Sequence, residues 1–240
     1  MVAQIKTFEP IYLYRYRPLA REEFYEREIS AVRDDFLWCS NFLSLNDPME
    51  GSYRGSPNLR NHGRYQFVRD KIFDQKNALG ICSFSETHDN GPMWAHYSDQ
   101  FQGICIAYNF RVLRESIPDE CSFVRLSYEE DPYLVTQARV SEGEEVAQRI
   151  LSSKSHRWLY EREWRLFCAA SGKLNLERRC ISRVYLGNRM DEQRRTNLLK
   201  VLADEHIEAH AMELDGYKLS FRNIKAGKFT TRPGLEDEVD

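Results

Sequence analysis

The sequence predicts an α+β fold, as a single domain with a mixed, largely antiparallel sheet flanked by helices. Short strand-like segments are numerous, and helical segments interrupt them irregularly, without a steady β-α-β rhythm. The 240 residues suit one large domain, with no internal repeat, low-complexity segment or clear domain boundary. We therefore expect one globular domain over residues 1–224 and a frayed acidic tail over 225–240.

The first half of the chain predicts strands and helices of unequal length. IYLYRYRP (11–18) alternates, so a strand here has three tyrosines on one face and Leu13, Arg15 and Arg17 on the other. A short helix is expected over 21–30, a strand over 36–40 and a turn-rich loop over 44–57. A helix over 63–76 and a strongly apolar strand over 78–86 follow. Asn90 as N-cap, with Pro92 near the first turn, predicts another short helix.

The second half predicts four further strand segments before the C-terminal hairpin. GICIAYNF (103–110), SFVRLSYEE (122–130), EWRLFCAA (163–170) and ISRVYLG (181–187) have the apolar content of strands. Ser141 followed by Glu144 forms a capping-box pattern, which predicts a helix through about Tyr160. An amphipathic helix is expected over 190–206. Two last strands, 209–214 and 218–224, flank a hairpin signal at Asp215-Gly216.

Composition excludes several classes of protein. The net charge of −3 gives no global attraction to nucleic acid or an anionic membrane, although local basic patches leave nucleic acid open as a partner. None of the six cysteines forms a C-x-x-C pair, and four lie in apolar runs, which indicates buried thiols in a reducing compartment. Neither a signal-peptide pattern nor an apolar run of about 20 residues is present, so we expect a cytoplasmic protein with no membrane partner.

The stretch WLYEREWRLF (158–167) places two glutamates close together. Glu161 and Glu163 would share one face of an extended chain, where like charges repel unless something compensates them. The predicted helix-to-strand junction leaves Glu161 near the turn and puts Glu163 at the start of the strand. Arg165 is then the same-face neutraliser of Glu163. A structural ion pair and a catalytic carboxylate both fit this pattern.

Three other segments carry polar residues in apolar surroundings. An inward-facing Arg15 must be paired or aimed at an anionic ligand, because burying it bare is costly. Asp47 lies in an Asn-Asp-Pro turn, where it either caps the backbone or takes part in chemistry. Trp94 and Tyr97 share a helix face, which is typical of a core pair but also suits a stacking wall for a flat base.

Together these segments resemble a widespread bacterial family known as a domain of unknown function, the DUF2971 type. The shared motifs are Y-[KR]-Y, N-D-P-[FM]-E, W-x-x-Y-[AS]-D followed by G-[IF]-x-[IV], W-x-Y-E-x-E-W-R and V-x-L-G. In this sequence they stand in that order at Tyr14–Tyr16, Asn46–Glu50, Trp94–Asp99, Trp158–Arg165 and Val184–Gly187. The resemblance spans residues ~12 to ~190 and implies no established chemistry.

A second resemblance is to the ADP-ribosyltransferase fold. Its sites look like a first-strand Arg or His, a second-strand Ser or Thr, and a later E-x-E pair. Here Arg15, Ser40 and Glu163 would fill those roles, with Glu161 as the first glutamate of the pair. The usual Ser-Thr-Ser triplet is absent, since this chain reads Cys39-Ser40-Asn41.

This second resemblance implies an NAD-using ADP-ribosyltransferase or NAD glycohydrolase that serves as a toxin or phage-defence effector. NAD would be a substrate, so the partner is a small-molecule nucleotide, with a macromolecular acceptor that the sequence does not identify. Glu163, Glu161 and Ser40 would be catalytic. The expected ligand-binding residues are Arg15, Tyr14, Tyr97, Trp94, Asp47 and Arg165. No metal is expected, since the histidines lack an H-E-x-x-H or H-x-H arrangement.

Two alternatives remain open at this level. The first is a metal-dependent nuclease that uses Asp47, Glu50, Glu161 and Glu163, with Lys154 assisting. The second is a non-catalytic ligand-sensing or interaction module in which the Glu-Arg network is structural.

Overall fold

An eight-stranded sheet forms the centre of the molecule. The computed structural model describes residues 9–140, 144–177 and 179–224. The strands of this sheet are β1 (Tyr12–Arg17), β4 (Gly80–Ser85), β5 (Ile104–Asn109), β6 (Ser122–Arg125), β10 (Glu163–Cys168), β12 (Ile181–Leu186), β13 (Glu208–Asp215) and β14 (Lys218–Ile224). Their order is β14-β13-β12-β5-β1-β4-β10-β6. Only β12 and β13 pair in parallel within it, which confirms the predicted α+β class with a mixed, largely antiparallel sheet.

The described residues also form three small sheets of two strands each. An antiparallel pair joins β2 (Phe36–Cys39) to β11 (Gly172–Asn175). Parallel pairs join β3 (Tyr53–Gly55) to β8 (Tyr133–Val135), and β7 (Ser127–Glu129) to β9 (Ser153–Ser155). Because β7 and β9 pair with each other, they bring two distant loops together beside β10.

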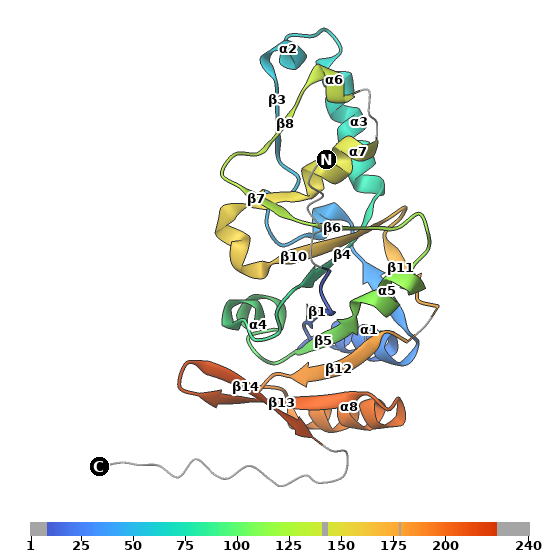
Figure 1. Ribbon diagram of the computed structural model, residues 1–240, viewed down its shortest axis with the longest axis vertical. Helices are drawn as coiled ribbons and strands as arrows, with labels where there is room; N and C mark the ends of the chain where they lie inside the picture. The colour runs from blue at the N-terminus through green and yellow to red at the C-terminus, as the bar shows by residue number, and fades with distance from the viewer. Residues whose placement is uncertain (1–8, 141–143, 178, 225–240) are drawn as a thin grey trace, which may run out of the picture.

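Helices cover the sheet and extend the molecule at one end. They are α1 (Glu22–Arg33), α2 (Pro57–Arg60), α3 (Tyr65–Ala78), α4 (Gly91–Tyr97), α5 (Phe110–Ser116), α6 (Gln137–Val140), α7 (Glu144–Leu151) and α8 (Glu192–Asp204), with 3₁₀ turns η1 (Phe42–Ser44) and η2 (His156–Glu161). In Figure 1, α2, α3, α6 and α7 gather with β3 and β8 at the top, while α8 lies with β13 and β14 at the bottom. Among the described residues, no helix has the length and apolar character required to cross a membrane.

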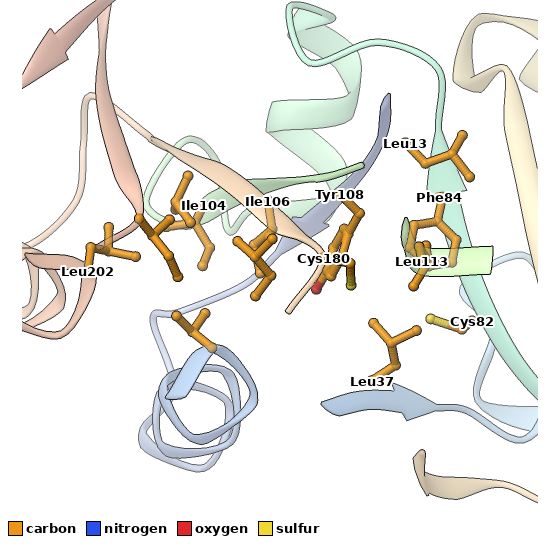
Figure 2. Close-up of a cluster of buried hydrophobic side chains, with 14 of the residues drawn as sticks. Leu13, Leu37, Cys82, Phe84, Ile104, Ile106, Tyr108, Leu113, Cys180 and Leu202 are labelled. Carbon is orange, nitrogen blue, oxygen red and sulfur yellow. The ribbon is translucent and has the colours of Figure 1, made fainter. Parts of the chain in front are cut away.

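The alternating sequence of β1 places its side chains on two faces, as predicted, and the structure packs each face in a different core. Leu13 packs in the main hydrophobic core with Phe84, Ile106 and Tyr108. Figure 2 shows these side chains gathered with Leu37, Leu113 and Leu202, which come from three further elements. The tyrosines of β1 face the other way: Tyr14 and Tyr16 belong to a second cluster under α4 that includes Trp94, Cys105 and Tyr185.

The sheet opens between β1 and β4. These two strands share a single paired position, Tyr14 with Ser85, although β4 and β10 stay paired along six positions. Beyond Tyr14 the chain of β1 leaves β4, and Ser40, at the end of β2, forms an isolated bridge with Ile81 of β4 instead. The gap leaves room for a cleft that side chains from both faces of the sheet can reach.

One predicted helix is shorter than expected. The chain was predicted to stay helical from Ser141 to about Tyr160, but α7 ends at Leu151 and is followed by β9 and η2. Ser152 donates its hydroxyl hydrogen to the carbonyl oxygen of Gln148, and Ser153 turns into the pairing with β7. Serines compete for backbone groups in this way and weaken a helix end. Ser141 and the predicted tail over 225–240 lie outside the described residues.

Candidate functional site

The glutamates of the E-x-E pair belong to a buried network of charges. Lys154 donates from Nζ to Glu161 Oε2 at 2.5 Å and to Glu163 Oε2 at 3.1 Å, and it lies 3.1 Å from Glu50 Oε1. Arg165 donates from Nε to Glu163 Oε1 at 2.7 Å. Its Nη2 donates to both oxygens of Glu50, at 2.8 and 2.9 Å. Three carboxylates therefore share two cations, which gives the ionised network a net charge of −1.

All five side chains lie almost entirely out of solvent, with exposed fractions between 1% and 6%. Charges at such depth are tolerated only when they are paired and hydrogen-bonded. Arg165 uses its remaining nitrogen, Nη1, to donate to the carbonyl oxygen of Leu151 at 2.7 Å. The predicted pairing of Arg165 with Glu163 is confirmed.

The environment separates the pKa values of the two glutamates. Burial raises the pKa of Glu161, and the nearby charge of Glu163 raises it further, against the opposing effect of Lys154. Burial would also raise the pKa of Glu163, but Arg165 and Lys154 overcome it and lower that pKa to about 2. Glu163 thus stays ionised, whereas Glu161 is the carboxylate that accepts a proton more readily. Two carboxyl groups with divergent pKa values are the usual basis of acid and base roles.

A reversal of the backbone aims both glutamates at one lysine. Glu161 ends η2, Arg162 has left-handed backbone angles (φ 45°, ψ 52°), and Glu163 begins β10. A non-glycine residue in this region costs about 1–2 kcal/mol. On the two sides of this residue, the carboxylates of Glu161 and Glu163 both contact Lys154.

The Asn-Asp-Pro loop supplies the third carboxylate. Asp47 Oδ1 accepts a hydrogen bond from the backbone N–H of Met49 at 2.9 Å, which closes the turn. Glu50 follows in that turn and reaches Arg165 and Lys154. Asn46 donates from Nδ2 to the hydroxyl of Tyr97 at 2.9 Å, and this hydroxyl donates to Glu161 Oε1 at 2.5 Å. The loop, α4 and β10 therefore hold one another through polar side chains.

A cleft of about 530 Å³ opens beside this network, at the gap between β1 and β4. Seven of the predicted site residues line it, namely Tyr14, Arg15, Ser40, Tyr97, Glu161, Glu163 and Arg165. In the strand pairing, Tyr14, Ser85 and Glu163 lie across from one another, so Arg15 belongs to the opposite face of the sheet. It reaches the cleft because β1 leaves β4 directly after Tyr14.

Two predicted residues lie elsewhere. Trp94 is fully buried in the second hydrophobic cluster, where its Nε1 donates to the carbonyl oxygen of His88 at 2.7 Å. Asp47 is 6% exposed and closes its own turn, as described above. Neither is among the residues that line the cleft. Both act indirectly: Trp94 packs in the hydrophobic cluster under α4, and Asp47 stabilises the turn that contains Glu50.

Lys154 and Glu50 were predicted as functional residues only under the nuclease alternative, although both belong to the buried network. Lys154 lies in SSKSH, a polar stretch that carries no signal of burial. Only the pairing of β9 with β7 brings its ammonium group among the carboxylates. Glu50, by contrast, had a signal in the N-D-P-M-E motif. Within the described part of the chain, no group of three or more His, Cys, Asp or Glu side chains has an arrangement that could hold a metal ion.

The comparisons with known proteins bear on the motifs of this site. Residues 93–166 match the profile of a family described as "Protein of unknown function (DUF2971)". The family resemblance is confirmed. The DUF2971 match contains Tyr97, Lys154 and the E-x-E pair, and the loop with Asn46 and Glu50 is joined to it by the hydrogen bonds given above. No curated protein and no solved structure matches the chain, so the likeness to the ADP-ribosyltransferase fold stays a prediction.

Proposed function

We propose that this protein cleaves the bond between nicotinamide and ribose in NAD, as an NAD glycohydrolase or an ADP-ribosyltransferase. One observation supports the proposal above all others: Arg15, Ser40 and Glu163, which are far apart in the sequence, line the same cleft. The volume of about 530 Å³ lies within the range of pockets that take a small organic ligand. Such an enzyme would suit a toxin or phage-defence effector, because it depletes a shared cofactor.

The proposed chemistry begins with loss of nicotinamide. The bond between C1′ of the ribose and the pyridinium nitrogen breaks, and nicotinamide leaves as a neutral molecule with the electron pair of that bond. The ribose becomes an oxocarbenium-like cation. Glu163 suits the stabilisation of this cation, because its depressed pKa keeps it ionised over the whole physiological range.

The second half-reaction needs a base. A water molecule, or a nucleophile on an acceptor, attacks C1′ and gives up a proton. Glu161 suits this step because its raised pKa makes it the stronger proton acceptor of the pair. The overall change is NAD⁺ plus water to ADP-ribose, nicotinamide and a proton. Tyr97 and Lys154 would hold Glu161 in place through contacts to its two oxygens, at 2.5 Å each.

The geometry gives less support to the nuclease alternative. A metal ion would need the space between Glu50, Glu161 and Glu163, and the ammonium group of Lys154 lies there within 3.1 Å of all three. Asp47, the fourth acid of that alternative, is engaged in its own turn. The sensing-module alternative predicts ligand binding without turnover, so one experiment separates it from the enzyme.

The experiment is incubation of the purified protein with NAD and measurement of released nicotinamide by chromatography. We expect release by the wild type and a loss of at least a hundredfold in Glu163→Gln. Glu213→Gln is the matched control, since Glu213 is an exposed glutamate of β13 that pairs with Arg222. Thermal melts establish that each variant is folded. No release by the wild type, or full release by a folded Glu163→Gln variant, refutes the proposal.

A further inference from the structure

One wall of the cleft is rich in arginine. Arg15 and Arg17 come from β1, Arg21 and Arg27 from α1, and all four line the cleft. The carboxylates near them are Asp99, which also lines the cleft, Glu28, which is 2% exposed, and Glu23, whose Oε1 lies 3.6 Å from Nη1 of Arg21. Four positive charges against three negative ones leave this wall with a net charge of +1.

The single carboxylate of Glu28 compensates only part of the positive charge of the arginines around it. Arg17 Nη2 and Arg27 Nε both contact the same oxygen, Glu28 Oε1, at 2.5 and 3.0 Å. Burial would raise the pKa of Glu28, but Arg17, Arg15 and Arg27 outweigh it and lower that pKa, so the carboxylate is ionised. Asp99 is engaged with the backbone, since its Oδ2 accepts from the N–H of Ala20 at 2.7 Å.

Two of the guanidinium groups have unused donors. Arg17 Nε is buried and has no hydrogen-bond partner. Arg15 is only 5% exposed, and the one hydrogen bond that its side chain makes among the described residues runs from Nη2 to the carbonyl oxygen of Trp38 at 3.0 Å. A guanidinium group has five N–H donors. Leaving such donors buried without acceptors is unfavourable, and an anion in the cleft would supply the acceptors.

An aromatic surface adjoins the arginines. Trp38 is 38% exposed and lines the cleft together with Phe24. The guanidinium carbon of Arg27 lies 5.6 Å from the ring centre of Trp38 and 5.0 Å from that of Phe24. An exposed indole beside a cationic group presents a flat face on which a nucleobase can stack.

We propose that this wall binds the pyrophosphate of a nucleotide through Arg15, Arg17 and Arg27, while Trp38 stacks on its base. The inference rests on the proposed function for its choice of a nucleotide, but it concerns binding alone. The arginines and Trp38 would then hold the ADP half of the ligand, and the acidic network would face the bond that breaks. ADP carries the diphosphate and the base but no nicotinamide, so it tests this wall in isolation.

The test is calorimetric titration of the full chain with ADP, and with adenosine as the ligand that lacks phosphate. We expect ADP to bind at least tenfold more tightly than adenosine. Arg17→Gln and Arg27→Gln should each weaken ADP binding at least tenfold, with little effect on adenosine. Trp38→Leu should weaken both ligands. Arg222→Gln is the matched control, because Arg222 is an exposed arginine on β14 that pairs with Glu213.

Two results would overturn the inference. One is wild-type protein that binds adenosine as tightly as ADP or binds neither. The other is ADP affinity that is unchanged in folded Arg27→Gln and Trp38→Leu variants, whose side chains are partly exposed and tolerate change better than Arg17. If ADP binds as expected while NAD is not cleaved, the binding wall stands and the proposed function fails.

Discussion

Removal of the lysine that the three glutamates share should destabilise the protein strongly. Lys154→Met keeps most of the volume of the side chain and deletes its charge. The net charge of the ionised network then falls from −1 to −2, and Arg165 is left as its only cation. Loss of one partner from a buried ion pair costs about 3–5 kcal/mol of the free energy of unfolding. That is a large share of the roughly 5–15 kcal/mol that a protein has in total.

The structure also predicts which second change relieves the damage. Within the described part of the chain, Glu161 has Lys154 as its one ion-pair partner, whereas Glu163 and Glu50 keep Arg165. Glu161→Gln alone removes one of three like charges and should cost less than about 2 kcal/mol. In the double variant, the glutamine no longer needs a cation. We therefore expect the two effects to be non-additive by about 1–3 kcal/mol, in the direction of recovered stability.

Urea unfolding, followed by tryptophan fluorescence, measures these free energies. Lys200→Met is the control, because Lys200 is exposed on α8, and it should change the free energy of unfolding by less than about 0.5 kcal/mol. In a protein of this size, a loss of about 4 kcal/mol corresponds to a fall in Tm of about 8–16 °C. A loss below about 1 kcal/mol in Lys154→Met, or strict additivity in the double variant, would refute the reasoning.

Three further predictions follow from the packing and the pKa shifts. As the pH falls through the raised pKa of Glu161, the free energy of unfolding should first rise, because the folded state binds that proton more tightly than the unfolded state does. Between about pH 4.5 and 2, the free energy of unfolding should fall by about 3 kcal/mol as Glu163 becomes protonated. Urea titrations at stepped pH measure this, and Glu161→Gln should abolish the early rise. A mild oxidant should form a disulfide between Cys121 and Cys168, whose sulfur atoms are 2.9 Å apart. The reaction should be faster at alkaline pH, because burial raises the pKa of Cys121 and the thiolate is the reactive form. Mass spectrometry detects the loss of two hydrogens, which Cys121→Ser should prevent. Gly103→Ala should cost several kcal/mol, since a Cβ there would lie 2.1 Å from a carbonyl oxygen at the end of β1; a Tm equal to that of the wild type would contradict this.

The periodic parts of the fold were predictable because their signal is local. The alternation of IYLYRYRP separates tyrosines from Leu13 and Arg15, and the structure packs these two sets against different cores. Asn90 was predicted as a helix cap, and its Oδ1 accepts from the backbone N–H of Met93 at 3.2 Å. The hairpin at Asp215-Gly216 likewise joins two paired strands. Each of these features depends on neighbours within a few residues.

The length of the helix predicted after Ser141 was wrong because its end depends on a contact with a distant segment. Its capping pattern gave no sign that Ser153–Ser155 would pair with Ser127–Glu129, about 26 residues earlier in the chain. That pairing ends the helix and places Lys154. Burial of a lysine depends on acids contributed by other segments, so local composition does not reveal it.

By itself, the sequence determined the α+β class, the two faces of β1 and several residues of the cleft, among them Arg15, Glu161 and Glu163, because residue type and short-range periodicity carry that information. The tertiary structure alone decided what those residues do to one another. It set the departure of β1 from β4 that opens the cleft, the left-handed backbone of Arg162 between the two glutamates, and the convergence of carboxylates and arginines from distant segments on one cleft. Charges interact through space, so their pKa values and pairings follow from distances that no sequence separation fixes.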